Sequence, residues 1–297
     1  MKDTELLMIK QVNPQLNPQL KQQLKMSVIF KPENHKYESL DPNEKIEWLS
    51  VTKFVSQFKQ PFDPVAQSEK ASKNPKSKWY GLSPAEIRAH WEKTTEEAIN
   101  RGSLYHNQRE EDLTSLDTIQ RSGKDIPIIK PIFNNGIKHA PEQRLVEGIY
   151  PEHFVYLKSA SLCGQSDMVE VIKDIINITD YKTNKEIKKT GFTNWEGITQ
   201  KMIGPCAHLD DCNFNHYALQ LSTYMYIIQK HNPRYRPGKM FLHHVIFELE
   251  GHDKFGNPIP KKDSKDEAIV KEVIPYEVPY LKSEVISMIN HIKDKRK

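Results

Sequence analysis

Residues 164–183 read Gly-Gln-Ser-Asp-Met-Val-Glu-Val-Ile-Lys-Asp-Ile-Ile-Asn-Ile-Thr-Asp-Tyr-Lys-Thr, and this stretch decides the fold that we expect. β-branched residues dominate both halves, and the polar pair Lys173-Asp174 separates them, which predicts a β-hairpin with a two-residue loop. When antiparallel pairs are counted outward from this loop, Asp167 faces Asp180 at the open end of the hairpin.

One face of this hairpin is apolar and ends in charge, because side chains alternate along a strand. Asp167, Asp180 and Lys182 belong to that face. Its apolar members are Val169, Val171, Ile176 and Ile178. Two neighbouring carboxylates at a buried edge repel each other, and their desolvation is unfavourable. We therefore expect a divalent cation between the two aspartates, with the ammonium group of Lys182 beside it.

These residues resemble a known nuclease motif. Gly164-x-x-Asp167 followed by Asp180-Tyr-Lys182 is similar to the core motif of the PD-(D/E)XK nuclease superfamily, in particular its RecB-like branch, which includes the mitochondrial genome maintenance exonuclease. Asp-x-Lys alone is a weak pattern, but the family's motifs recur in order over about residues 50–250. They are Gly102-Ser-x-x-His106-x3-Glu110, Glu147, Gly164-x-x-Asp167, Asp180-x-Lys182 and Gln220-x3-Tyr224.

The resemblance implies an α/β fold with a mixed central β-sheet flanked by helices, the restriction-endonuclease-like core, and metal-dependent hydrolysis of DNA phosphodiesters. The implied metal ligands are Asp167, Asp180, the Tyr181 carbonyl, His106 and, for a second metal, Glu147. Oxygen ligands with one imidazole suit Mg²⁺ or Mn²⁺ better than zinc. Lys182 is implied to position or help deprotonate the attacking water and to screen the developing charge.

Two of the implied ligands have alternatives. His106 and Glu110 are four residues apart and share a face on a helix, where they could also form a simple pair. Residues 144–150 have a strand pattern in which Glu147 faces inward, and a buried carboxylate there needs a partner such as a metal. Glu152 is the competing residue, but the neighbouring Pro151 indicates a turn.

Residues 216–228 predict a buried helix, since apolar side chains surround most of its circumference. Gln220 and Tyr224 lie four residues apart on one face and need polar partners there. The resemblance implies that both residues contribute to catalysis by orienting Lys182 or a substrate phosphate.

Another helix start is marked by Ser83-Pro84-x-Glu86, in which Ser is the N-cap, Pro the first helical residue and Glu closes a capping box. We expect this helix to reach Gly102, and a second helix to begin after it. The connections at 59–80 and 114–142 are expected to be irregular.

The length of 297 residues and a hydrophobic content of 37% suit one large domain. We expect a mobile tail at 1–25, where repeated prolines block a helix, and a single nuclease domain at 26–297 with an insertion at 184–215. No apolar run or signal-peptide pattern suggests a membrane, so we expect a soluble cytoplasmic protein, and a phage or viral origin is left open. The net charge of +4 permits nucleic-acid binding without requiring it.

The 3 cysteines indicate a reducing compartment. Cys206-x-His208-x3-Cys212-x3-His216 could be drawn as a zinc site, but a single residue between the first two ligands is unusual. Related nucleases with an iron–sulfur cluster use four cysteines. We therefore expect neither zinc nor an iron–sulfur cluster.

The insertion carries the candidate substrate contacts. Phe192, Trp195 and Phe214 alternate there with lysines, which suits stacking on unpaired bases while the lysines follow the backbone, although the aromatics could equally tuck into the core. The lysines are Lys185, Lys188, Lys189 and Lys201. The resemblance implies an exonuclease, and if the insertion holds a single strand we expect it to act on single-stranded ends or flaps of DNA. The alternatives are a structure-selective or restriction-type endonuclease, and a non-catalytic DNA-binding module of a recombination complex.

Overall fold

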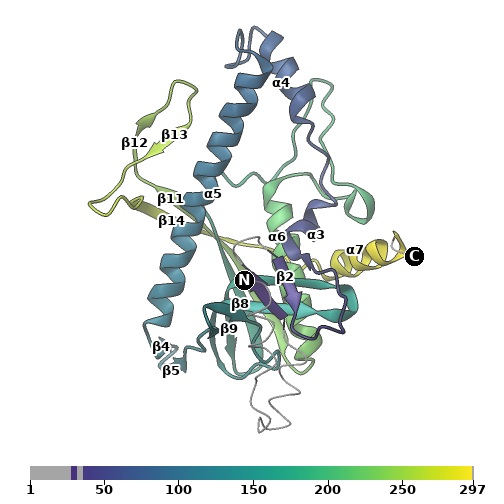
Figure 1. Cartoon of the computed structure of the whole chain (residues 1–297), viewed down its shortest axis with the longest axis vertical. Helices are drawn as coiled ribbons and strands as arrows, with labels where there is room; N and C mark the ends of the chain where they lie inside the picture. The colour runs from purple at the N-terminus through teal and green to yellow at the C-terminus, as the bar shows by residue number, and fades with distance from the viewer. Residues whose placement is uncertain (1–27, 32–35, 296–297) are drawn as a thin grey trace, which may run out of the picture.

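The computed structural model describes residues 28–31 and 36–295. In this part of the chain a central six-stranded sheet has helices on both faces, so the protein is a mixed α/β structure (Figure 1). The expected tail at 1–25 lies outside the described residues. None of the helices in 28–31 and 36–295 combines the length and the apolar character needed to cross a membrane.

The central sheet has the order β14-β11-β10-β9-β3, and β8 pairs with β9 as well. Its strands are β3 (Leu49–Ser50), β8 (Gly148–Leu157), β9 (Leu162–Ile172), β10 (Ile175–Lys182), β11 (Arg236–Phe247) and β14 (Val270–Glu277). β10 runs parallel to β11 and β3 parallel to β9, whereas β8–β9, β9–β10 and β11–β14 are antiparallel. The sheet is therefore mixed, as expected.

The hairpin of β9 and β10 forms with the predicted loop and register, from Ile172 opposite Ile175 to Met168 opposite Thr179. The expected pairing of Asp167 with Asp180 does not occur, because the ladder ends one pair earlier. From this point β9 continues against β8 while β10 continues against β11. The two strands therefore diverge where the charged residues lie. At this point the Asp167 carboxylate accepts a hydrogen bond from the Tyr181 amide, 2.6 Å away.

Helices cover the sheet on both sides. They are α3 (Val51–Ser56), α4 (Pro64–Lys73), α5 (Pro84–Thr114), α6 (Asn213–His231) and α7 (Lys282–Lys295). The main core lies between α3, α6, α7 and the hairpin face that carries Val169 and Ile178. On the other face Tyr105 of α5 contacts Tyr181 and Phe247, which places the long helix α5 across the strand ends (Figure 1).

Helix α5 begins as predicted, with Ser83 and Glu86 forming a reciprocal capping box. The expected break at Gly102 is wrong, since one helix of 31 residues runs through it. A Cβ at Gly102 would lie 3.4 Å from Thr183 Oγ1, so the helix passes close to the end of β10 at this residue. A single glycine lowers helix stability by about 1 kcal/mol, which the turns on either side outweigh.

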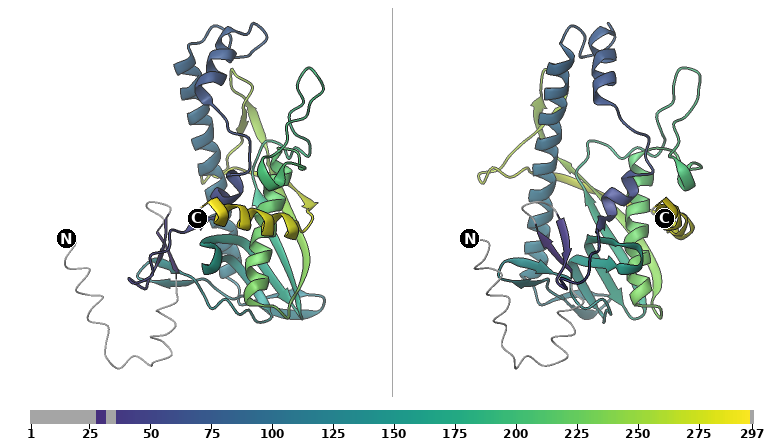
Figure 2. Two further views of the ribbon diagram at one scale, coloured as in Figure 1. Left: turned by 90° about the vertical axis from the view of Figure 1, so that its right-hand side faces the viewer. Right: turned by 45° about the vertical axis from the view of Figure 1, so that its right-hand side comes forward.

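The stretches expected to be irregular contain further structure. Asp63 caps α4 by accepting hydrogen bonds from the amides of Val65 and Ala66, with Pro64 as the first helical residue. α4 and the first half of α5 stand together above the sheet (Figure 2). The remaining strands form small sheets: β1 (Val28–Lys31), β2 (Lys36–Ser39), β6 (Ile132–Asn134) and β7 (Ile137–His139); β4 (Thr118–Arg121) and β5 (Lys124–Pro127); β12 (Leu249–His252) and β13 (Pro258–Pro260).

Candidate metal centre

Three side chains from three elements meet where β9 and β10 diverge: His106 of α5, Glu152 of β8 and Asp167 of β9. The Nδ1 atom of His106 lies 3.3 Å from Asp167 Oδ2 and 3.7 Å from Glu152 Oε1. Their ligand atoms all lie within 4.8 Å of one another. Sequence analysis predicted His106 and Asp167 for this site, and the structure brings these two together.

The orientation of His106 turns one of its ring nitrogens toward the two carboxylates. Its Nε2 lies 3.1 Å from the Tyr181 carbonyl, which can only accept, so Nε2 carries the proton and donates. The Nδ1 lone pair of a neutral ring then faces two carboxylates. The ring nitrogen and the two carboxylate oxygens are all acceptors, and at these distances they repel one another. A proton or a metal ion must therefore lie between them. Metal-binding histidines typically donate their other N–H to a carbonyl in this way.

The pKa values of His106, Glu152 and Asp167 also indicate that the cluster needs a positive charge. Burial lowers the pKa of His106, but the charge and hydrogen bonds of Asp167 and Glu152 outweigh it and raise the pKa to about 10. Burial raises the pKa of the Glu152 carboxyl. Burial also opposes ionisation of Asp167, but His106 and Lys182 hold its pKa below the ordinary value. Without a metal, a proton on His106 therefore holds the cluster together.

Glu152 has an unusual backbone for a strand residue. Its φ angle is 44°, in the left-handed region that costs a non-glycine residue about 1 kcal/mol or more. The pairs on either side, Pro151 with Met168 and His153 with Ser166, keep the same register. The local twist therefore occurs opposite Asp167, and it accompanies the contact of the Glu152 carboxylate with His106.

The structure does not bring Glu147, the predicted ligand of a second metal, to this cluster. Glu147 precedes β8 and lies at the loop end of the hairpin, where its carboxylate pairs with Lys124 at 2.6 Å and accepts from the Lys173 amide. Pro151, which counted against Glu152, is accommodated within β8. Counting pairs outward from the turn between β8 and β9 places Glu152 opposite Asp167, a signal in the sequence that would have identified it.

Asp180 and Lys182 lie next to the cluster. Asp180 is 1% exposed and forms an ion pair with the ammonium group of Lys182. Within the described residues neither carboxylate oxygen of Asp180 has a well-aligned hydrogen-bond donor. Burial and the charge of Asp167 raise the pKa of Asp180 to about 6. Burial lowers the pKa of Lys182, but Asp180 and Asp167 together raise it above its ordinary value, so the ammonium stays charged.

The Tyr181 carbonyl, expected to bind the metal directly, instead contacts the cluster through His106. Glu110, on the same face of α5 as His106, pairs with Lys138 at 3.0 Å. Its link to the cluster is electrostatic, since Lys138 in turn lowers the pKa of Glu152.

Gln220 and Tyr224 of α6 lie beneath the hairpin, as the buried helix predicted. The Gln220 amide donates to Tyr224 Oη at 3.4 Å. A Cβ at position 164 would lie 2.9 Å from the Tyr224 ring, so the first glycine of Gly164-x-x-Asp167 is required by the close approach of this tyrosine. Burial raises the pKa of the Tyr224 hydroxyl, and the charges of Asp180 and Asp167 contribute to the rise.

Of the predicted insertion at 184–215, residues 184–212 are largely without regular structure, whereas the last three residues already belong to α6, which begins at Asn213. Trp195 is 92% exposed, whereas Phe214 packs against the core. Lys185 and Lys188 are exposed, and Lys188 pairs with Glu186. The two histidines of the possible zinc-binding pattern pair with different carboxylates, His208 with Glu284 and His216 with Asp211.

Among residues 28–31 and 36–295, only His106, Glu152 and Asp167 form a group of three potential metal ligands. One imidazole nitrogen and two carboxylates, with an under-satisfied Asp180 beside them, fit a divalent cation. Comparison of the chain with family models, with curated proteins and with solved structures finds no match.

Proposed function

We propose that this chain is a metal-dependent deoxyribonuclease that hydrolyses DNA phosphodiesters from free single-stranded ends or flaps. The observation that carries the proposal is the meeting of His106, Glu152 and Asp167 beside the buried pair of Asp180 and Lys182. Multiple carboxylates around one imidazole favour a divalent cation, and a charged lysine next to them favours a phosphoryl substrate.

The order of motifs along the chain supports the same proposal. The hairpin brings Asp167 and Asp180 to one end of a mixed sheet, and α5 delivers His106 to them. This arrangement agrees with a restriction-endonuclease-like core, the fold that the PD-(D/E)XK resemblance implies. Gln220 and Tyr224 meet beneath the same end of the sheet, as the last motif of the RecB-like branch implies.

His106, Glu152 and Asp167 would hold Mg²⁺ or Mn²⁺, which when bound polarises a phosphoryl oxygen and lowers the pKa of water. Lys182 remains protonated because Asp180 and Asp167 raise its pKa, so it acts as a hydrogen-bond donor and a positive charge, not as a base. Its ammonium lies over the Tyr217 ring at 4.8 Å as well, and these contacts hold it in place. From there it can orient a water or a non-bridging phosphate oxygen.

Activity assays with labelled DNA test the proposal. Linear single-stranded, linear double-stranded, flapped and covalently closed circular substrates are incubated with Mg²⁺, Mn²⁺ or EDTA. We expect metal-dependent release of products from linear single strands and flaps, and none from closed circles. Lys182→Ala should abolish release while the protein remains folded by circular dichroism. No hydrolysis of any substrate with either metal would refute a nuclease, and cleavage of closed single-stranded circles would refute an exonuclease.

Two glutamates in the same segment provide a matched pair for the metal site. Glu152→Gln should lower turnover by at least about the 10–100-fold that loss of an outer-shell partner costs, and should reduce the rise in Tm caused by Mn²⁺. Glu147→Gln should leave both quantities as in wild type, because this residue pairs with Lys124. If Glu147→Gln lowers both quantities and Glu152→Gln does not, Glu147 is the ligand instead.

A further inference from the structure

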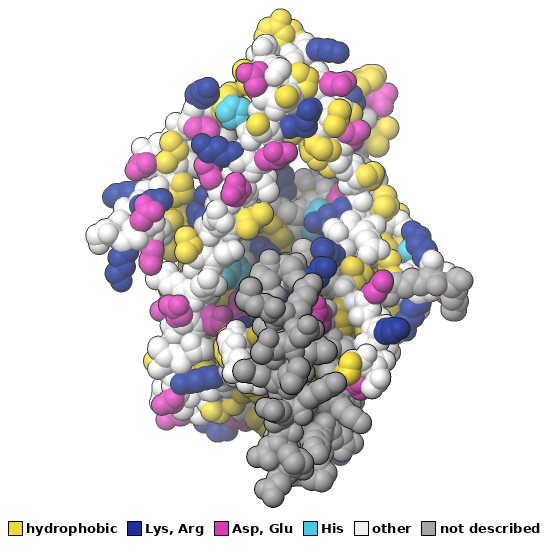
Figure 3. Space-filling view, in the orientation of Figure 1, with side chains coloured by type: hydrophobic (Ala, Val, Ile, Leu, Met, Phe, Trp, Pro, Cys, Tyr) yellow, Lys and Arg dark blue, Asp and Glu magenta, His cyan; other side chains and the backbone are white. Residues whose placement is uncertain are grey.

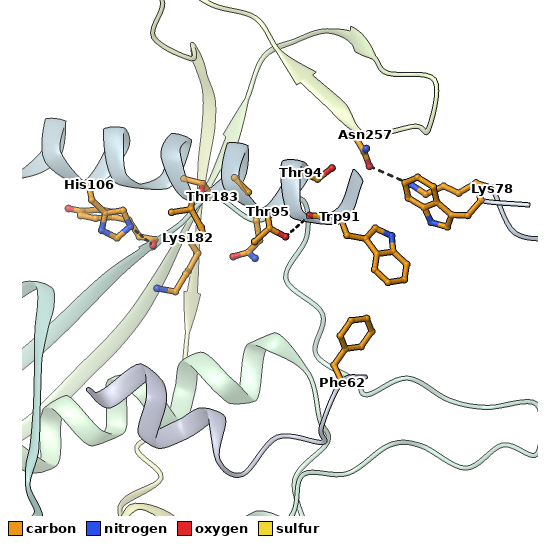
Figure 4. Close-up of a pocket in the computed structure, with 14 residues that line it drawn as sticks. Phe62, Lys78, Trp91, Thr94, Thr95, His106, Lys182, Thr183 and Asn257 are labelled. Carbon is orange, nitrogen blue, oxygen red and sulfur yellow. Dashed lines mark hydrogen bonds between the residues drawn. The ribbon is translucent and has the colours of Figure 1, made fainter. Parts of the chain in front are cut away.

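A cavity of about 720 Å³ connects the metal centre with a group of aromatic side chains in the region of α4 and α5. His106, Tyr181 and Lys182 line one end, and Phe62 and Trp91 line the other (Figure 4). Thr94, Thr95, Ala98 and Ile99 of α5 form the wall between them. In the space-filling view the molecule is hollowed near the centre of this face, beside the column formed by α5, with Lys and His side chains at the edge (Figure 3).

The aromatic end of the cavity contains an exposed aromatic side chain. Phe62, on the segment before α4, and Trp91, on α5, turn toward one another with ring centroids 5.9 Å apart (Figure 4). Trp79, which is buried, contacts Trp91 edge to face with ring centroids 6.3 Å apart. Phe62, in contrast, is 68% exposed. A tryptophan that packs on a buried ring, beside an exposed phenylalanine, is an arrangement on which a planar ligand can stack.

The charged side chains that line the cavity favour an anionic ligand. Lys78 and Lys182 line it, and none of its described lining residues is Asp or Glu. A second cavity of about 820 Å³, between α5 and the β12–β13 hairpin, has a lining of mixed charge. Its carboxylates are those of Glu97, Glu250, Asp253, Asp266 and Glu267, and its cations are those of Lys93, Arg101, Lys254 and Lys262. Of these two cavities, the first is therefore the better match for a phosphate backbone.

Helix geometry sets the length of ligand that joins the two ends. Trp91 and His106 are both on α5, and at 1.5 Å per residue their separation along the helix is about 22 Å. A stacked strand advances 3.4 Å per nucleotide and an extended one roughly twice as far, so this separation corresponds to about three to six nucleotides.

We propose that Phe62 and Trp91 bind an unpaired base of the substrate, about three to six nucleotides from the phosphodiester at the metal centre. This inference rests on the proposed nuclease function and adds a subsite to it. Both faces of a base are covered in a duplex by neighbouring pairs, so a side chain stacks on a base far more readily in a single strand. The subsite therefore selects single strands over duplexes and requires a minimum length.

Binding without catalysis tests this subsite. The affinity of wild-type protein for fluorescent oligothymidylates of two to ten nucleotides is measured by anisotropy in EDTA. We expect an increase in affinity once the oligonucleotide is long enough to reach Phe62. Phe62→Ala should remove that increase and weaken binding of a ten-nucleotide strand about five-fold or more, as expected for one stacked base. Because Phe62 is largely exposed, this variant should fold and melt like wild type.

Tyr80→Ala is the matched control, since Tyr80 is 59% exposed close to Trp79 but does not line the cavity. It should bind like wild type. An abasic nucleotide scanned along the ten-nucleotide strand should weaken wild-type binding most at one position, three to six nucleotides from the end. At that position it should add little to the effect of Phe62→Ala. Equal affinities of wild type and Phe62→Ala at every length would overturn the subsite.

A small chromogenic phosphodiester, bis(p-nitrophenyl) phosphate, separates this inference from the proposed function. It is too short to reach the aromatic end, so wild type and Phe62→Ala should hydrolyse it equally with Mn²⁺. If neither protein hydrolyses it or cleaves DNA, the proposed function fails. If both hydrolyse it and Phe62→Ala still binds and cleaves long single strands like wild type, only the aromatic subsite fails.

Discussion

Asp180→Asn should stabilise the metal-free protein at pH 8 and lose this advantage at pH 4. Burial and the charge of Asp167 raise the pKa of Asp180 from 3.8 to about 6. An acid whose pKa is higher in the folded state disfavours folding once it ionises. The penalty is absent below pH 3.8, grows as pH rises toward 6, and is constant above it.

The magnitude follows from the two pKa values. Each pKa unit corresponds to about 1.4 kcal/mol, so the change from 3.8 to about 6 corresponds to about 3 kcal/mol. The pKa of about 6 already includes the attraction between the Lys182 ammonium and the Asp180 carboxylate. Asparagine resembles the protonated acid and does not ionise. About 0.5 kcal/mol of this penalty is already present at pH 4, because the unfolded acid is more than half ionised there. The variant's advantage in unfolding free energy should therefore be about 2.5 kcal/mol larger at pH 8 than at pH 4, or roughly 5–10 °C in Tm.

Urea unfolding and thermal melts in EDTA, at intervals from pH 4 to pH 8, provide the measurement. Asp174→Asn is the control, because the exposed Asp174 pairs with Arg236 and its pKa is lowered below 3.8. Its carboxyl is therefore ionised in the folded protein throughout the measured range, and the difference between this variant and wild type should change little from pH 4 to pH 8. Added Mn²⁺ should favour wild type over Asp180→Asn. A difference between Asp180→Asn and wild type that stays constant from pH 4 to pH 8 would refute the reasoning.

Two further predictions concern contacts outside the ligand set. Gly164→Ala should lower the free energy of unfolding by about 1–3 kcal/mol, because the new Cβ would lie 2.9 Å from the Tyr224 ring; Tyr224→Leu should restore part of the loss, and full stability of Gly164→Ala in urea would contradict the contact. Trp195→Ala should leave Tm unchanged, since the side chain is 92% exposed, while the affinity for single strands in EDTA falls about five-fold; a fall in Tm with unchanged affinity would count against base stacking by Trp195.

Local signals in the sequence predicted the parts of the fold whose partners are close along the chain. The hairpin of β9 and β10 formed with its predicted loop, because alternation of β-branched residues and a polar pair act within a few residues. The capping box of Ser83 and Glu86 is equally local. For the same reason Asp167 and Asp180 could be assigned to one buried end of the hairpin before the rest of the sheet was known.

The assignment of Glu152 depended on tertiary structure. The choice between Glu147 and Glu152 turns on how β8 meets β9, and on a left-handed backbone at Glu152 that no local propensity favours. A proline beside a carboxylate usually marks a turn, but the pairing of β8 with the long strand β9 overrides that preference. The surrounding structure stabilises a conformation that the isolated segment would avoid.

The helices also combine features that local sequence predicts with features that only tertiary packing decides. The sequence predicted that α5 begins at Pro84 and that His106 lies on a helix, but one continuous helix through Gly102 emerged only with α5 placed against the strand ends. The approach of Phe62 to Trp91 likewise joins residues from separate elements. A chain can encode a helix or a hairpin in a short stretch, because the stabilising contacts are between near neighbours. The cluster of His106, Glu152 and Asp167 and the cavity beside it combine residues that are distant in the sequence, so their geometry is decided only when the whole core has formed.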